Sequence, residues 1–193
     1  MHSKQINMKI KTETILTVSK YLALLGGVWY CILWGSQLTT LVASFINPDW
    51  AKRTYEVDLN LFSIRDHSTS FYVYAMCLTI TVSVLKACVW YVVFDLLSKL
   101  KLQNPFSREV EKKLERIAYL LLGVWIVSNI FWKTYIYYLT KETGIYYLTK
   151  ETGIQLPANT SGDEYLFMAG IIYIISQVFK RGIEIQEEND LTV

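Results

Sequence analysis

The sequence predicts an all-α membrane protein with four transmembrane helices and both termini in the cytoplasm. Of its 193 residues, 52% are hydrophobic and only 19% are charged, against about 25% charged in an average soluble domain. The apolar residues gather in four long blocks, and Lys and Arg gather at alternate ends of these blocks. A chain of this length predicts a single domain over residues 1–193.

The four apolar blocks cover residues of about 21–46, 71–94, 117–138 and 165–179. A helix needs about 20 residues to cross roughly 30 Å of hydrocarbon, and the first three blocks reach that length. The fourth block is shorter, but Lys180 directly follows it, so we predict a fourth span. A buried or interfacial helix is the alternative for this block.

Basic residues predict the orientation, because cytoplasmic flanks carry an excess of Lys and Arg. Most of the 19 basic residues lie before the first block, between the second and third, and after the fourth. Both termini are therefore expected in the cytoplasm. The first block is too long for the core of a signal peptide, so it is expected to stay as an uncleaved anchor.

Small residues recur at every fourth position of the first span, among them Gly27, Cys31 and Gly35, and the second span repeats the pattern with Thr79 and Ser83. In lipid, helices associate where small residues let their backbones approach closely. We therefore predict that the first two spans pack on these residues. Homodimerisation is the alternative use of the same positions.

Each span also carries a polar residue: Gln37, Lys86, Asn129 and Gln177. Counted from the cytoplasmic side, Lys86 and Gln177 fall in the inner half and the other two farther out, which allows two polar pairs inside a bundle. A Lys at a helix centre costs about 2.5–3.5 kcal/mol on insertion scales and marks a functional site by default. The alternative is that Lys86 snorkels inward beside Trp90 or has a structural partner.

The external loops favour a small β element. Residues 55–61 alternate strictly between apolar and polar, as in a half-buried strand, and residues 136–144 form a β-prone run that is repeated identically at 145–153. We expect these loops to pair as strands. The repeat itself is predicted to be a tandem insertion, because added loop length costs little free energy.

The loop between the second and third spans predicts a helix that starts well before the membrane. Asn104 or Ser107 suits the N-cap, Pro105 suits the first turn, and Glu109 lies where the helix dipole favours an acid. We expect a solvated amphipathic segment, with a partner-binding surface as the alternative.

Acidic residues dominate the C-terminal tail, which is predicted to bind a partner through Glu184, Glu187, Glu188, Asp190, Leu191 and Val193. The three glutamates share one helical face by their spacing. Two interpretations stay open. The tail can be attracted to the basic loop of its own chain or remain solvated, or it can dock a basic cytosolic protein.

The residues that carry chemistry elsewhere are scarce. His2 and His67 lie far apart, and the three cysteines fall inside apolar blocks, where they are expected to be small packing residues. We therefore expect no enzymatic activity, no catalytic residue, no cofactor and no metal. A net charge of +2 also predicts no direct binding of nucleic acid.

Several segments resemble an uncharacterised family of small bacterial four-span membrane proteins. They are Asn-Pro-Phe-Ser at 104–107, the run at 170–173, Arg181-Gly182 and the final Glu-Asn-Asp-Leu-Thr-Val at 188–193. The resemblance implies the bacterial cytoplasmic membrane. It also implies a partner, because members are often encoded beside a Cro/CI-type helix-turn-helix regulator. The repeat at 145–153 departs from the family pattern.

Two functions follow as expectations. The first is a non-catalytic signalling protein of the inner membrane that docks or regulates a cytosolic partner, such as a small transcription regulator. The alternative is a small permease, channel or immunity component whose intramembrane polar residues line a path. Four helices make at most a narrow path, so this alternative needs a homo-oligomer in the lipid bilayer.

Overall fold

The computed structural model describes residues 2–54, 65, 68–100, 106–142 and 162–190, and side chains are described from residue 13 on, except at 52–54 and 138–142. The long helices are α1 (His2–Ile46), α4 (Thr69–Lys99), α5 (Arg108–Glu142) and α7 (Asp163–Asp190), and the short α2 (Pro48–Thr54) follows α1. Each of the long helices is long and apolar enough to cross a membrane. The predicted all-α class and the four spans are confirmed.

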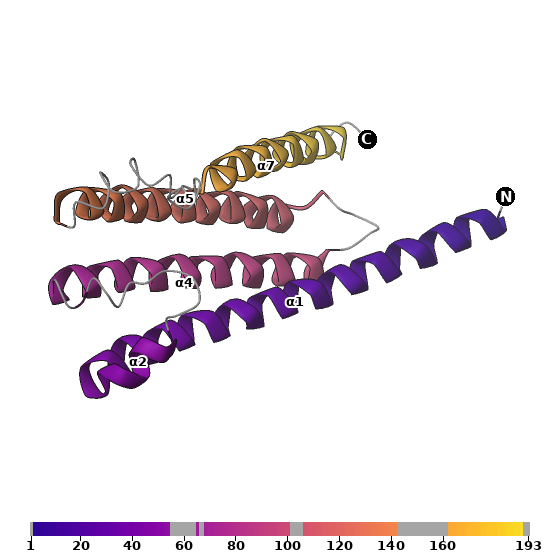
Figure 1. Cartoon of the computed structure of the whole chain (residues 1–193). Helices are drawn as coiled ribbons and strands as arrows, with labels where there is room; N and C mark the ends of the chain where they lie inside the picture. Colours follow the sequence, from indigo (N-terminus) through magenta and orange to yellow (C-terminus); the bar gives the residue numbers. More distant parts are fainter. Residues whose placement is uncertain (1, 55–64, 66–67, 101–105, 143–161, 191–193) are drawn as a thin grey trace, which may run out of the picture.

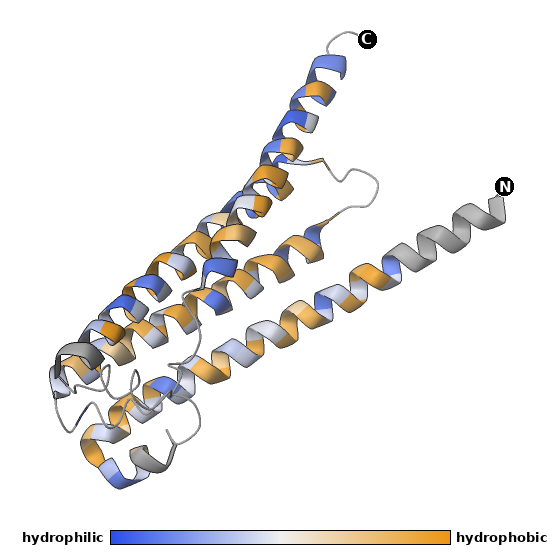
Figure 2. Cartoon of the chain, turned by 45° about the horizontal axis from the view of Figure 1, so that its top comes forward, coloured by the Kyte–Doolittle hydropathy of each residue, from blue (hydrophilic) through white to orange (hydrophobic). Residues whose placement is uncertain are grey.

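The long helices form a row in which α1 packs on α4, α4 on α5, and α5 on α7 (Figure 1). Both chain termini lie at one end of this row, called the terminal end below. Large apolar side chains remain exposed on the outer faces, including Leu25, Trp29, Phe167 and Ile174. Figure 2 shows hydrophobic residues along much of the length of the long helices, as expected for helices that meet lipid.

Two apolar clusters hold the row together. One lies away from the terminal end, where Tyr72 and Met76 of α4 are fully buried against Leu41, Phe131 and Tyr135. The other lies nearer the terminal end and joins three helices, with Val92 and Leu96 of α4 against Ile117 of α5 and Ala169 of α7. The helices therefore stay side by side through apolar packing at both ends.

Ala23, Thr40 and Ser44 are the buried residues of α1 in the part whose side chains are described, and Ala23 lies between α1 and α4. A Cβ atom on Gly26 would lie 2.6 Å from the Trp90 ring, so this ring rests directly on the α1 backbone. Ala23 and Gly26 are three residues apart, and Thr40 and Ser44 are four residues apart. Such spacings stay on one face of a helix, whereas a strict spacing of four drifts by about 40° per step.

The small-residue prediction is therefore only partly right. Gly27 contacts α4, with a Cβ-equivalent position 3.7 Å from Trp90 Cβ, and Ser83 is buried. Cys31 is exposed, and no atom lies within 4 Å of a Cβ placed on Gly35. The predicted contact at Gly35 is wrong, because the drift turns this position away from α4, and Cys31 lines an open groove between α1 and α4 instead of packing tightly in the seam. Homodimerisation through them stays a prediction.

Of the two predicted N-caps, Ser107 caps α5, because the Val110 amide donates to Ser107 Oγ at 3.3 Å. Its other end overturns an expectation. Residues 136–142, expected as a strand, continue α5 as helix. Each added residue of an existing helix gains a hydrogen bond without a new nucleation cost, which outweighs β propensity. The segments 55–61 and 145–153 lie outside the described residues.

The last helix begins beside the middle of α5. Gly162 has a left-handed φ of 72° and lies against Ser128. Trp125 Nε1, halfway along α5, donates to Asp163 Oδ1 at 3.1 Å. From there α7 runs along the first half of α5 and continues as helix to Asp190, so most of the acidic tail is helical.

Candidate functional site

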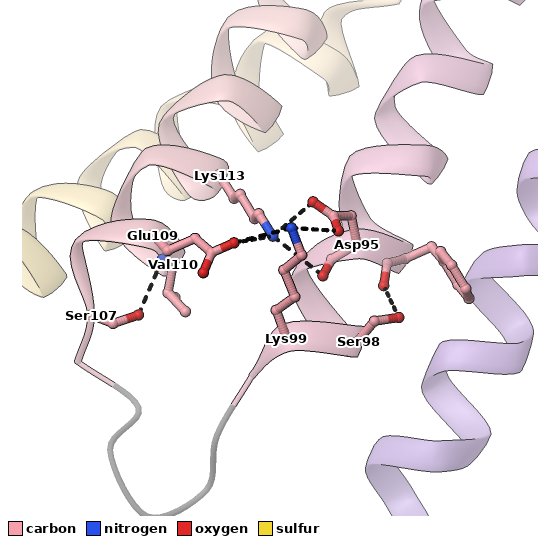
Figure 3. A network of polar contacts seen from close by, with 8 residues as sticks. Asp95, Ser98, Lys99, Ser107, Glu109, Val110 and Lys113 are labelled. Carbon is pink, nitrogen blue, oxygen red and sulfur yellow. Dashed lines mark hydrogen bonds and ion pairs between the residues drawn. The ribbon is translucent and has the colours of Figure 1, made fainter.

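Four charged side chains of α4 and α5 form a closed network at the terminal end (Figure 3). Lys113 Nζ lies 2.7 Å from Asp95 Oδ2 and 3.1 Å from Glu109 Oε1. Lys99 Nζ lies 3.3 Å from Asp95 Oδ1 and 3.2 Å from Glu109 Oε1. Each cation thus contacts both acids and each acid both cations. The network joins the end of α4 to the start of α5.

Lys113 is the most enclosed member of this network, with its side chain 13% exposed. Its ammonium also reaches the Asp95 carbonyl oxygen at 3.4 Å. An enclosed cation without its acids would carry an uncompensated desolvation cost. The network is therefore a structural clamp, and its four charges are already matched within the chain.

A second ion pair holds the tail. Arg108 of α5 donates to Glu187 of α7 through two nitrogens, with Nη2–Oε2 at 2.8 Å and Nε–Oε1 at 3.1 Å. Close by, the rings of Phe106 and Phe179 lie 5.0 Å apart, and a Cβ on Gly182 would approach Phe106 to 3.0 Å. Bidentate pairing fixes orientation as well as distance. The end of α7 therefore has a defined position against the start of α5.

These contacts show which of the predicted partner-binding residues are paired within the chain. Glu187 pairs with Arg108, so the predicted attraction between loop and tail is confirmed for this residue. Glu184 pairs with Arg181 at 2.9 Å. Glu188 and Asp190 are exposed on the last turns of α7. Leu191 and Val193 lie outside the described residues.

The predicted intramembrane polar pairs do not form. Gln37 accepts a hydrogen bond from Ser83 at 2.9 Å and thereby joins α1 to α4. Asn129 donates to the Trp125 carbonyl oxygen at 3.2 Å, and Gln177 donates to Ser176 Oγ at 3.4 Å. Thr79 likewise donates to a carbonyl of its own helix. In a row of helices these residues face different neighbours, so they do not line one path within a single chain.

Lys86 has two aromatic neighbours from different helices. Its ammonium lies 4.8 Å from the ring centre of Tyr165 in α7 and 5.7 Å from that of Tyr30 in α1. The predicted snorkelling toward Trp90 is wrong, because a helical side chain leans toward the N-terminus of its helix and Trp90 lies toward the C-terminus. Cation–π contacts stabilise the charge instead.

Several contacts in the structure were not predicted from the sequence. Asp95 had a local signal, because it stands four residues before Lys99 on a helix. The pairing of Trp125 with Asp163 had none, since it depends on where α7 begins. The cysteines, expected as packing residues, are exposed. Among the residues that the structure describes, no three His, Cys, Asp or Glu side chains gather as metal ligands.

Four apolar helices in a row, clamped by ion pairs at one end, define a multi-pass α-helical membrane protein. The chain belongs to DUF2975, a family of proteins of unknown function, whose model matches residues 38–193. The match includes both ion-pair clusters and confirms the resemblance to an uncharacterised family. No curated protein and no solved structure matches the chain.

Proposed function

We propose that this chain is a non-catalytic protein of the bacterial cytoplasmic membrane that binds a cytosolic partner at its terminal end. The distribution of Lys and Arg supports a cytoplasmic position for this end. The observation that carries the proposal is the course of α7, which continues beyond its apolar residues to Asp190 and is held to α5 by the Arg108–Glu187 pair.

A helix held in this way suits binding. Because its position is already defined, less conformational freedom is lost when a partner binds. The exposed carboxylates of Glu188 and Asp190 favour a partner with a basic surface. A small helix-turn-helix regulator has such a surface, since it binds DNA through phosphate contacts. Binding to the tail would occupy that surface and withhold the regulator from DNA.

A crosslinked pull-down from native membranes tests the proposal and identifies the partner by mass spectrometry. The intact chain is compared with a chain lacking residues 186–193 and with the charge reversal Glu188→Lys. We expect the reversal to lower recovery of the regulator by about tenfold, because it places like charges against each other.

Glu13→Lys is the matched control. Glu13 is an exposed acid on α1 toward the same end, and its reversal changes the net charge equally. This variant should recover as much regulator as the intact chain. Equal recovery by all variants, or equal loss in Glu13→Lys and Glu188→Lys, would contradict docking on the tail.

A further inference from the structure

An open apolar groove of about 400 Å³ lies between α1 and α4, in the half of the row nearer the terminal end. Its lining includes Ala23, Gly27 and Cys31 of α1 and Ala87, Trp90 and Phe94 of α4. Small residues of both helices, Ala23 and Gly27 of α1 and Ala87 of α4, leave space between the larger side chains that line the groove. Its volume lies within the range of small-molecule sites, and its apolar lining suits a hydrocarbon chain.

The wall of the groove is well defined. The Trp90 ring rests on the α1 backbone at Gly26, where an added Cβ would lie 2.6 Å from the ring. Gly27 and Cys31 follow on the neighbouring face and leave the space beside this ring open. The packing of α1 against α4 therefore forms the groove.

A positive charge stands at one end of the groove. The ammonium of Lys20 lies 5.4 Å from the ring centre of Phe94, and Phe94 lines the groove. Lys20 directly precedes the first apolar block, so it lies at the level where the hydrocarbon of a bilayer ends. Basic pockets between transmembrane helices at this level bind acidic lipid headgroups.

We propose that the groove binds an anionic phospholipid, with one acyl chain along Gly27, Cys31 and Trp90 and the phosphate beside Lys20. The charge of Lys20 beside a largely apolar groove selects this occupant. A second copy of the chain would fill the apolar space without using the ammonium. The proposal is independent of partner docking on the tail, because it uses α1 and α4 alone.

Native mass spectrometry of the full chain in detergent tests the proposal. The protein is titrated with phosphatidylglycerol and, separately, with phosphatidylcholine of the same acyl chains. We expect the intact chain to bind phosphatidylglycerol more tightly. Lys20→Gln should reduce that preference by about fivefold, the usual effect of one basic residue near a membrane surface. Gly27→Leu, which fills the groove, should weaken binding of both lipids.

Lys180→Gln is the matched control, because Lys180 is an exposed basic residue at the end of another apolar block. It should bind both lipids as the intact chain does. Equal affinity for the two lipids in the intact chain, or an unchanged preference in Lys20→Gln, would overturn the proposal. So would a dimer that Gly27→Leu abolishes without any effect on lipid binding, since the groove would then hold a second copy.

Discussion

Two glycines of α1 show how one helix face differs from the next. A Cβ at Gly26 would lie 2.6 Å from the rigid ring of Trp90, whereas nothing lies within 4 Å of a Cβ at Gly35. Both residues belong to the same apolar block and look alike in the sequence. Only the rotation of α1 against α4 makes the first position intolerant of a side chain.

At the residue scale, we predict that Gly26→Ala destabilises the protein and Gly35→Ala does not. Both changes gain helix propensity, about 1 kcal/mol for Gly to Ala. At Gly26 this gain is outweighed by overpacking against Trp90, which costs about 1–3 kcal/mol. Thermal unfolding in detergent measures the difference, with a lower Tm expected for Gly26→Ala. Equal Tm values for the two variants would show that Trp90 does not press on α1.

At the scale of elements, polar contacts hold both ends of α7 against α5. Its first turn is held by Trp125 and its last turns by Arg108. The Arg108–Glu187 pair is exposed, with side chains 66% and 52% accessible. An exposed pair adds little to the stability of the folded chain, because water screens its charges. It therefore governs local order at the helix end more than the stability of the whole chain.

We predict that Arg108→Gln speeds amide exchange over residues 184–190 by about fivefold, because the end of α7 opens more often without the ion pair. Exchange over 165–179 should not change, because those residues pack on α5 through apolar side chains. Hydrogen exchange with mass spectrometry measures both segments. Arg116→Gln, an equal charge change on α5, is the control, and slow exchange at 184–190 in both variants would contradict an anchoring role.

The ends of helices were predicted correctly where residues close together in the chain determine them. Ser107 caps α5 as its place before the acids Glu109 and Glu111 indicates. Residues 136–142 were mispredicted, because their β-prone composition is a local signal that the helix preceding them overrides. The polar residues of the spans lie on the helices predicted from the apolar blocks. Their partners were not predicted, because rotation about each helix axis is decided by packing.

At the scale of the molecule, a row buries less apolar surface than a closed bundle, because the outer faces of its helices are not covered by the other helices of the row. Leu25 on α1 and Phe167 on α7 are 64% and 71% exposed. In water such surfaces would drive association, whereas lipid covers them at no cost. The bilayer therefore takes the place of a larger protein core.

The repeated segment permits a prediction for the whole chain. Deleting residues 145–153 should leave membrane insertion and abundance unchanged, because the apolar blocks that insert, and most of the basic residues that orient them, remain. The two copies are identical, so deleting 136–144 gives the same polypeptide. Membrane fractionation with immunoblotting measures the outcome. Deleting 121–129 from the third block is the positive control, and a similar loss of protein in both deletions would contradict the prediction.

The sequence by itself determined the class, the four apolar helices and the cap of α5, because hydropathy, charge and capping act over a few neighbouring residues. Only the tertiary structure decided the order of helices in the row, the start of α7 beside Trp125, and which side chains meet Lys86. These depend on the rotation and the offset of each helix against its neighbour. Both are set by the packing of side chains that lie far apart in the chain.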